Sequence, residues 1–302
     1  MIKSAGNNSK LKISTVAINA LFAVYAGICI LPVLIVLAVS FSKESDILYH
    51  GYSLLPKEFT LDAYGFVFRD SSNVIRSYLV TICITIIGSL LSLTVISMFA
   101  YPLSRNCLKY KKWFTMYIFI TMLFSGGLVP WYIVCSQVLH IRNTYFALFL
   151  PTLFNAWFVI IMRTFYKTTI PDSVIESAKI DGAGEMRIFL TIVSPMALPA
   201  YATVALFCTL NYWNDWWLSM ILTTDSKYRT LQYFIYKVLV DASIIQQMQN
   251  RIAANAQEMI RNLPSESARF AMCVIAMGPI LFIYPFFQKY FVKGLTVGAI
   301  KG

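Results

Sequence analysis

At residues 170–200 the sequence reads IPDSVIESAKIDGAGEMRIFLTIVSPMALPA, and this stretch decides how the rest of the chain is interpreted. Ser173 and Glu176 have the spacing of a capping box, which is typical of a helix N-terminus. The segment 181–184, Asp-Gly-Ala-Gly, should end that helix, because glycine lets the backbone reverse sharply. A second helix is expected from about Glu185. The stretch therefore predicts two short helices joined by a tight turn, a shape suited to docking into a partner.

The order of residues in this stretch resembles the EAA motif of permease subunits of binding-protein-dependent ABC importers. That motif reads E-A-A-x3-G-x9-I-x-L-P, and the chain supplies Glu176-Ser177-Ala178, Gly182, Ile192 and Pro195 in the same order. Ser177 and Ser194 depart from it, in place of an alanine and the leucine. An ordinary amphipathic linker would explain a helix here, but it would not explain the ordered Glu, Gly, Ile and Pro.

In that family the motif forms a coupling helix that sits in a groove of a separate ATPase subunit. The resemblance implies that residues 170–187 play this role in the present chain. It also implies which side chains contact the ATPase: Glu176, Ser177, Ala178, Asp181, Gly182 and Ala183.

The composition is that of an integral membrane protein. Of 302 residues, 58% are hydrophobic and only 13% are charged, which leaves too little polar surface for a water-soluble fold of this size. Apolar runs long enough to cross a bilayer are predicted at about 17–41, 74–102, 113–138, 144–165, 196–222 and 268–287. The prediction is an all-α, single-domain protein over residues 1–302. By resemblance it is a six-helix permease bundle of the type I ABC importer (MetI-like) class with a cytoplasmic coupling helix.

The distribution of charge predicts the orientation. The net charge of +11 comes from short basic clusters beside apolar runs, so it favours membrane orientation and not nucleic-acid binding. With both termini in the cytoplasm, about 14 of the 25 basic residues fall on the cytoplasmic side, as the positive-inside rule requires. The segments 42–73 and 223–267 are then external, the latter with a helix expected near 244–261. A bacterial cytoplasmic membrane is the implied location.

Within the third span, Gly126, Gly127 and Pro130 should weaken or kink the helix. Irregular backbone at membrane depth is tolerated where protein or a watery cavity satisfies it. This span therefore either borders the transport pathway or carries a simple packing kink.

No catalytic constellation is present in the sequence. It contains no phosphate-binding G-x-x-x-x-G-K-[ST] loop, H-E-x-x-H or C-x-x-C motif. The six cysteines lack metal-ligand spacing and are interpreted as reduced packing residues. The chain is thus predicted to be no enzyme and to bind no metal or cofactor, with ATP and Mg²⁺ held by a separate ATPase.

Asp215 is the one carboxylate inside a predicted span, and a carboxylate in lipid is functional or paired by default. It lies among amide and aromatic side chains, a mixture that binds sugars through hydroxyl hydrogen bonds and stacking on C–H faces. The alternative is an aromatic belt at the outer interface. The predicted substrate pathway comprises Asn211, Trp213, Asn214, Asp215 and Trp217, with Asn155 and Trp131 as weaker candidates.

Nearly the whole chain resembles carbohydrate-importer permeases. The resemblance rests on the Trp213-Asn214-Asp215 run, the Ser125-Gly126-Gly127-Leu128-x-Pro130 segment and the ending at 292–302. It implies import of an oligosaccharide, together with a second related permease, two ATPase subunits and an extracellular solute-binding protein. An importer of a non-sugar solute and a self-sufficient secondary transporter remain as alternatives.

Overall fold

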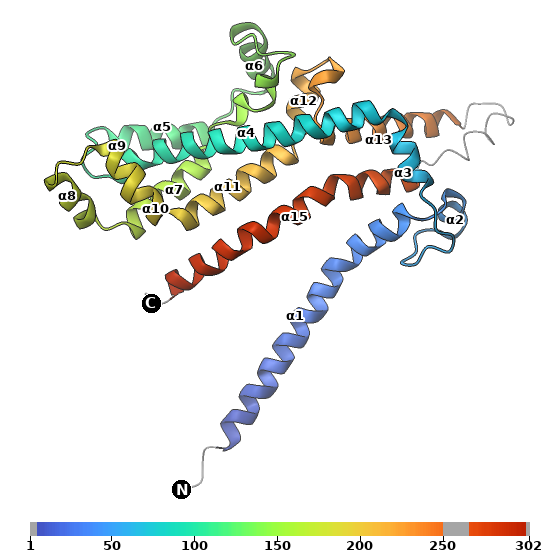
Figure 1. Ribbon diagram of the computed structural model, residues 1–302, viewed down its shortest axis with the longest axis horizontal. Coiled ribbons are helices and arrows are strands. Elements are labelled where there is room, and N and C mark those ends of the chain that lie inside the picture. Colours follow the sequence, from blue (N-terminus) through green and yellow to red (C-terminus); the bar gives the residue numbers. More distant parts are fainter. Residues whose placement is uncertain (1–4, 250–265, 300–302) are drawn as a thin grey trace. The chain divides into compact units, whose positions relative to one another are not determined.

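The computed structural model describes residues 5–249 and 266–299 (Figure 1). Within these ranges the chain is helical apart from turns and one isolated antiparallel bridge between Ser42 and Phe59. It packs into two compact units, one made of residues 1–71 with 239–277 and the other of residues 72–238 with 278–302. A single domain over residues 1–302 stays a prediction.

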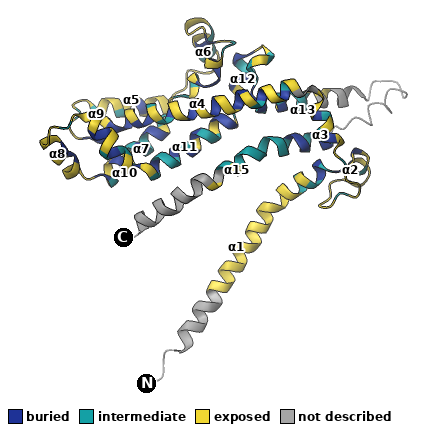
Figure 2. Cartoon of the chain, viewed as in Figure 1, coloured by how far each residue is buried: buried dark blue, intermediate teal, exposed yellow. Residues whose placement is uncertain are grey.

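In the first unit, α1 (Ala5–Ser40) is apolar around its whole circumference over residues 15–40 and mostly exposed there (Figure 2). A helix that is apolar on every side needs lipid or a partner protein around it. The unit also contains α2 (Glu44–His50), α3 (Asp62–Val67) and a 3-10 turn at Phe68–Asp70. These short helices account for the predicted segment 42–73.

Glu44 fixes the start of the last helix, α15 (Glu266–Ala299). Its buried carboxylate accepts hydrogen bonds of 2.9 Å from the backbone N–H groups of Glu266 and Ser267, and one of 2.8 Å from the Ser267 hydroxyl. The first N–H groups of a helix have no partner inside it, so the carboxylate satisfies them. The positive end of the helix dipole also stabilises a carboxylate at this position.

The second unit begins with α4 (Ser71–Ser104), followed by α5 (Lys111–Leu123) and α6 (Leu128–Ile133). A π-helical turn (Val134–Val138) and two 3-10 turns (Tyr145–Leu148 and Leu150–Thr152) lead into α7 (Ala156–Thr169). Next come α8 (Asp172–Ile180), α9 (Glu185–Ile188), a π-helical turn (Phe189–Val193), α10 (Ser194–Met196) and α11 (Leu198–Trp213). The remaining elements are α12 (Trp217–Leu222), a 3-10 turn (Ser226–Tyr228) and α13 (Leu231–Gln249).

The described residues contain three helices that are long and apolar enough to cross a membrane, at 15–40, 72–104 and 266–283. Three further pairs of helices pass the same test together but are bent at a short break, by 111°, 51° and 83°. If each bent pair is one span, the total is six. The predicted fold class, an all-helical membrane protein with six spans, is thereby confirmed.

The helix boundaries differ from the predicted spans at identifiable breaks. α5 ends at Leu123, and Gly127 has a positive φ of 84°, in the Gly126-Gly127 region where the sequence predicts weakness. The predicted span 144–165 begins with 3-10 turns, and its α-helix starts only after Asn155. The span 196–222 is interrupted at residues 214–216. In the segment 223–267 the helix begins at 231 and not near 244, while 250–261 lies outside the described residues.

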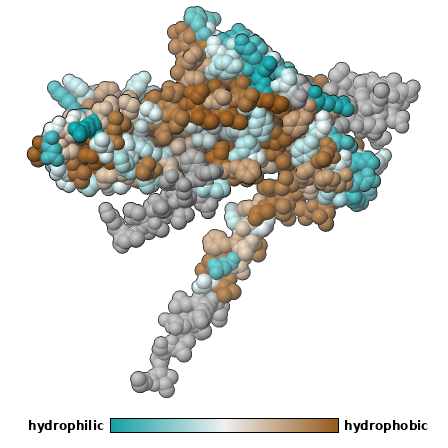
Figure 3. Space-filling model, in the orientation of Figure 1, coloured by the Kyte–Doolittle hydropathy of each residue, from teal (hydrophilic) through white to brown (hydrophobic). Residues whose placement is uncertain are grey.

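The core of the second unit lies between α4, α7 and α11, which run alongside one another in Figure 1. Its fully buried members include Ile96 on α4, Val159 and Met162 on α7, and Val204 on α11. The outer face of α4 is apolar and exposed instead, as the brown surface of Figure 3 shows. The core thus fixes this bundle, while the outer apolar face is left for lipid or a second subunit.

Gly88 lets α4 and α11 approach closely. A Cβ atom added at Gly88 would come within 2.8 to 2.9 Å of the Tyr212 ring. The hydroxyl of Tyr212 donates a hydrogen bond of 3.2 Å to the carbonyl of Phe149, so its contact of 2.8 Å with the Ser92 hydroxyl is one that it accepts. The ring is held on both sides and cannot withdraw without breaking these bonds.

We expect Gly88→Ala to destabilise the bundle by about 1–3 kcal/mol, because an extra methyl group must push the held Tyr212 ring aside. Thermal unfolding of the purified protein in detergent would measure this. The matched control is Gly27→Ala in α1, where nothing lies within 4 Å of the added Cβ. Equal melting temperatures for the two variants would contradict the expectation.

Candidate functional site

The short helix α8 has a buried face and an exposed face. Ile175 and Ala178 are buried in the core cluster with residues of α7 and α9. The exposed face carries Glu176 and Ser177, and at its end Ile180, which is 86% exposed. Ile180 therefore projects from the end of this short helix.

The turn after α8 is a Schellman motif. The N–H of Gly182 bonds to the carbonyl of Lys179 at 3.0 Å, and the N–H of Ala183 bonds to the carbonyl of Ala178 at 2.9 Å. Gly182 has a φ of 81°, which is the left-handed conformation that this motif requires. Gly184 has an ordinary φ of −72° and lies directly before α9. Only the first of the two predicted turn glycines is therefore needed for its backbone freedom.

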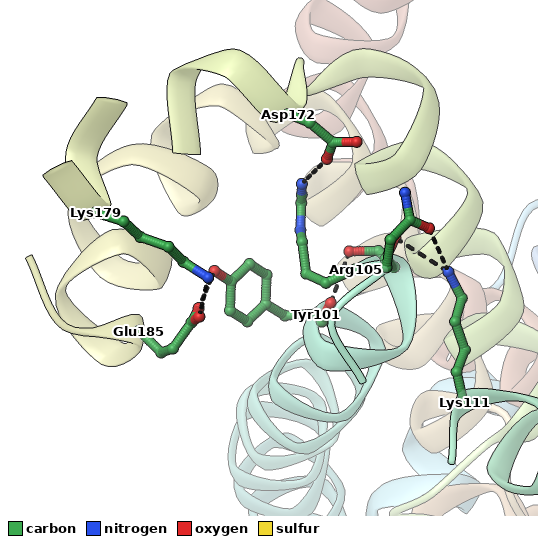
Figure 4. Close-up of polar contacts among 8 residues, drawn as sticks. Tyr101, Arg105, Lys111, Asp172, Lys179 and Glu185 are labelled. Atoms are coloured by element: carbon green, nitrogen blue, oxygen red, sulfur yellow. Dashed lines mark hydrogen bonds and ion pairs between the residues drawn. The ribbon is translucent and has the colours of Figure 1, made fainter. Parts of the chain in front are cut away.

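Two ion pairs tie α8 to its neighbours (Figure 4). At its start, Asp172 accepts a hydrogen bond of 3.1 Å from Arg105, which follows the end of α4. At its end, Lys179 pairs with Glu185 on α9. Glu185 also accepts a hydrogen bond of 2.8 Å from the Tyr101 hydroxyl on α4. The hydrogen bond with Glu185 raises the pKa of Lys179 above its usual value, so this pair stays charged at neutral pH.

The predicted contact residues do not all face outwards. Glu176, Ser177, Asp181 and Gly182 are exposed and Ala183 is partly exposed, but Ala178 is buried and positions the helix. The predicted capping box does not form: α8 begins at Asp172, and no side chain caps it. The Ser177 hydroxyl bonds instead to the carbonyl of Ser173.

Sequence reasoning missed two residues at this site. One is Arg105, whose side chain is 6% exposed and pairs with Asp172. A charged residue directly after an apolar span was the available hint. Ile180 was missed because it does not belong to the EAA motif, although an isoleucine beside Asp181 at a helix end breaks the polar pattern.

A polar cavity lies between α4, α7 and α11, away from α8. Its volume is about 330 Å³. Three of the predicted pathway residues line it together, namely Asn155, Asn211 and Asp215. Its other polar lining groups come from Ser92, Thr152 and Tyr212.

Two of the polar groups are positioned at helix ends. The carboxamide oxygen of Asn155 accepts hydrogen bonds from the N–H groups of Trp157 (3.0 Å) and Phe158 (3.4 Å), so it caps α7. Asp215 lies in the break between α11 and α12 and accepts a hydrogen bond of 2.9 Å from the N–H of Leu218. The cavity is therefore built at two helix breaks, where backbone and side chains supply hydrogen-bonding groups at membrane depth.

The predicted aromatic pathway residues lie elsewhere. Trp213 is 2% exposed and packs edge-on against Tyr78, so its faces are not available for stacking on a sugar. The rings of Trp217 and Trp131 contact each other at a tilt of 40°, with centroids 4.8 Å apart. Asn214 is exposed, bonds to the carbonyl of Leu210 and does not line the cavity.

Comparison with known proteins identifies the class of this chain. Residues 65–297 match the family described as "Binding-protein-dependent transport system inner membrane component". The chain belongs to this family. It is accordingly a permease subunit of an ABC importer and not an enzyme. Membership also implies a membrane location and partners that include a solute-binding protein and an ATPase.

The permease is similar to named relatives over nearly its full length. It is 35% identical over 294 residues to the polygalacturonan/rhamnogalacturonan transport system permease protein YtcP of Bacillus subtilis, covering 97% of this chain and 100% of that one. It is 30% identical over 284 residues to the trehalose/maltose transport system permease protein MalG of Thermococcus litoralis, covering 92% and 93%.

A solved structure has the same fold. The permease aligns with a chain of a bacterial ABC transporter involved in the import of the acidic polysaccharide alginate. The TM-score is 0.77 at 26% identity, covering 96% of this chain and 100% of that one. The resemblance inferred from the sequence is thereby confirmed.

We expect Gly182→Ala to distort the end of α8, because an L-residue in this conformation costs about 1–2 kcal/mol. Binding of the purified permease to its ATPase subunit should weaken by roughly five- to thirtyfold if that strain is relieved by moving the turn. Gly184→Ala is the control, since its φ is ordinary and nothing lies within 4 Å of the added Cβ. Equal effects of the two substitutions would show that the turn geometry is unimportant.

Proposed function

We propose that the exposed face of α8 docks onto an ATPase subunit on the cytoplasmic side of the membrane. The observation that carries this proposal is the fully projecting Ile180 at the end of a helix held rigidly by two ion pairs and a Schellman turn. The sequence contains no phosphate-binding loop of its own, so ATP and Mg²⁺ belong to the partner. Family membership supports such a partner.

The proposed orientation puts α8 and both termini in the cytoplasm and the segment 223–267 outside. It is supported by the basic residues between α4 and α5 and in α7 and α8, on one side of the predicted spans. The proposed assembly contains this permease, a second related permease, two ATPase subunits and an extracellular solute-binding protein. In this arrangement ATP-driven closure of the ATPase pair would move α8 and switch the bundle between inward-open and outward-open states.

We further propose that the cargo is an oligosaccharide and that the polar cavity of Asn155, Asn211 and Asp215 contributes to its path. Sugars need paired donors and acceptors, which carboxamide, carboxylate and hydroxyl groups supply. Two relatives and the solved neighbour are named for saccharide transport. No basic side chain lines this cavity, so this permease's share of the path favours uncharged sugar units.

We expect Ile180→Glu to weaken ATPase binding by roughly 10- to 100-fold, because the loss of one buried isoleucine costs about 1.5–3 kcal/mol. Copurification of the ATPase and its rate of ATP hydrolysis in the reconstituted complex would measure this. The matched control is Leu55→Glu, at a leucine that is 81% exposed in the predicted external segment. A complex that assembles normally with Ile180→Glu would refute the docking proposal.

For the cargo, we expect Asn211→Leu to lower oligosaccharide uptake by about tenfold, since a hydrogen-bonding group is removed from the cavity. Asn214→Leu is the control, because Asn214 lies three residues further along and outside the cavity. Uptake into proteoliposomes, with binding protein and ATP, should be measured for sugars and for a peptide. Equal loss of sugar and peptide uptake would favour an importer of a non-sugar solute. Uptake without ATP would favour a secondary transporter.

A further inference from the structure

A second cavity, of about 510 Å³, lies between the start of α5 and α7 and is strongly basic. Lys109, Lys111, Lys112 and Arg163 line it. The remaining lining residues are Thr115, Met116 and Phe119, all on α5. The cavity has no part in the docking surface of α8 or in the polar cavity described above.

The positive charges of this cavity are not neutralised within the described part of the chain. None of the four basic side chains that line it forms an ion pair there. Lys111 makes only long contacts with neutral oxygens, 3.5 Å to the Ser104 carbonyl and 3.4 Å to the Asn106 carboxamide (Figure 4). Arg163 donates to the carbonyl of Leu103.

The electrostatic surroundings of Lys111 are also positive. Its charged neighbours include the cations Arg163, Lys167 and Arg105 and the carboxylate of Asp172. That carboxylate is already paired with Arg105. The fold therefore gathers cations around a cavity without supplying the anion that would balance them, which favours an external anionic ligand.

The apolar residues of the cavity continue along one face of α5. Thr115 and Phe119 follow Lys111 at intervals of four residues, and Met116 follows Lys112 in the same way, so they form a stripe below the lysines. Met116 is 52% exposed and Phe119 is 43% exposed. The stripe leads away from the basic end along α5, which passes the test for a membrane span together with the bent segment after it.

We propose that this cavity binds an anionic phospholipid, with its phosphate headgroup among Lys109, Lys111, Lys112 and Arg163 and an acyl chain along Met116 and Phe119. A basic pocket beside membrane-spanning helices is suited to such headgroups. A free phosphate would satisfy the cations but not the apolar stripe. In the proposed orientation this site lies in the cytoplasmic leaflet. The lipid proposal itself does not depend on that orientation.

The test uses the complete transporter, purified with its partner subunits, delipidated in neutral detergent and titrated with dioleoyl phosphatidylglycerol. Bound lipid is counted by native mass spectrometry, with phosphatidylcholine as the uncharged comparison. The double variant Lys109→Gln/Lys112→Gln should bind phosphatidylglycerol about 30-fold more weakly, because each basic residue near an anionic lipid contributes about one factor of five in affinity. Thermal unfolding checks that the variant is folded.

The matched control is Lys57→Gln/Lys227→Gln, which removes the same charge from two exposed lysines. Lys227 lies over the ring of Tyr228 as Lys109 lies over that of Tyr110, so each pair loses one such contact. The control should bind phosphatidylglycerol like the wild type. Ile180→Glu, which tests the docking proposal, should also retain lipid binding even where the ATPase is lost.

Three results would overturn the lipid proposal. The first is equal phosphatidylglycerol binding by the wild type and by Lys109→Gln/Lys112→Gln. The second is displacement of the lipid by equimolar glycerophosphoglycerol, the headgroup without acyl chains, which would show that the apolar stripe contributes nothing. The third is loss of ATPase subunits in place of lipid in the double variant, which would assign the basic cluster to a protein contact.

Discussion

The buried guanidinium of Arg105 fixes the position of the start of α8. It follows the end of α4, stacks over the Tyr101 ring at 5.4 Å and reaches Asp172 in the first turn of α8. The Arg105 side chain is 6% exposed but that of Asp172 is 62% exposed, so the pair positions the start of α8 more than it adds net stability. Asp172 also stabilises the start of α8 through the helix dipole. Together with the Lys179–Glu185 pair and the turn at Gly182, the Arg105–Asp172 contact fixes the position of α8.

The sequence was sufficient to predict the class of protein and the two short helices joined by a turn in residues 170–200. Hydropathy gave the spans, because a bilayer demands a long apolar run whatever the fold, and the Glu-Ser-Ala, Gly, Ile, Pro order marked residues 170–200. The turn at Gly182 followed from glycine's conformational freedom. These are local properties, and local properties can be read from one sequence.

What could not be predicted depends on long-range packing. Ala178 and Trp213 belong to patterns that suggest contact with a partner or a sugar, but the core of this chain buries both. Asn155 was only a weaker pathway candidate, yet it caps α7 and lines the polar cavity beside Asn211 and Asp215, which are distant in sequence. Helix breaks such as residues 214–216 also escape hydropathy, because an apolar run remains apolar when its helix is interrupted.

The unbroken helix α4 connects the two ends of the second unit. Ser92 lines the polar cavity and Arg105, just beyond the end of α4, holds α8; at 1.5 Å per residue, these positions are about 20 Å apart along a nearly continuous helix. A continuous helix of this kind couples displacements at either end to the other end. Thermodynamic linkage is reciprocal. If nucleotide bound to the ATPase changes the affinity of the cavity for a sugar, then a bound sugar changes the affinity of the ATPase for that nucleotide by the same factor. Sugar binding in the permease would thus be coupled to the state of the ATPase subunit.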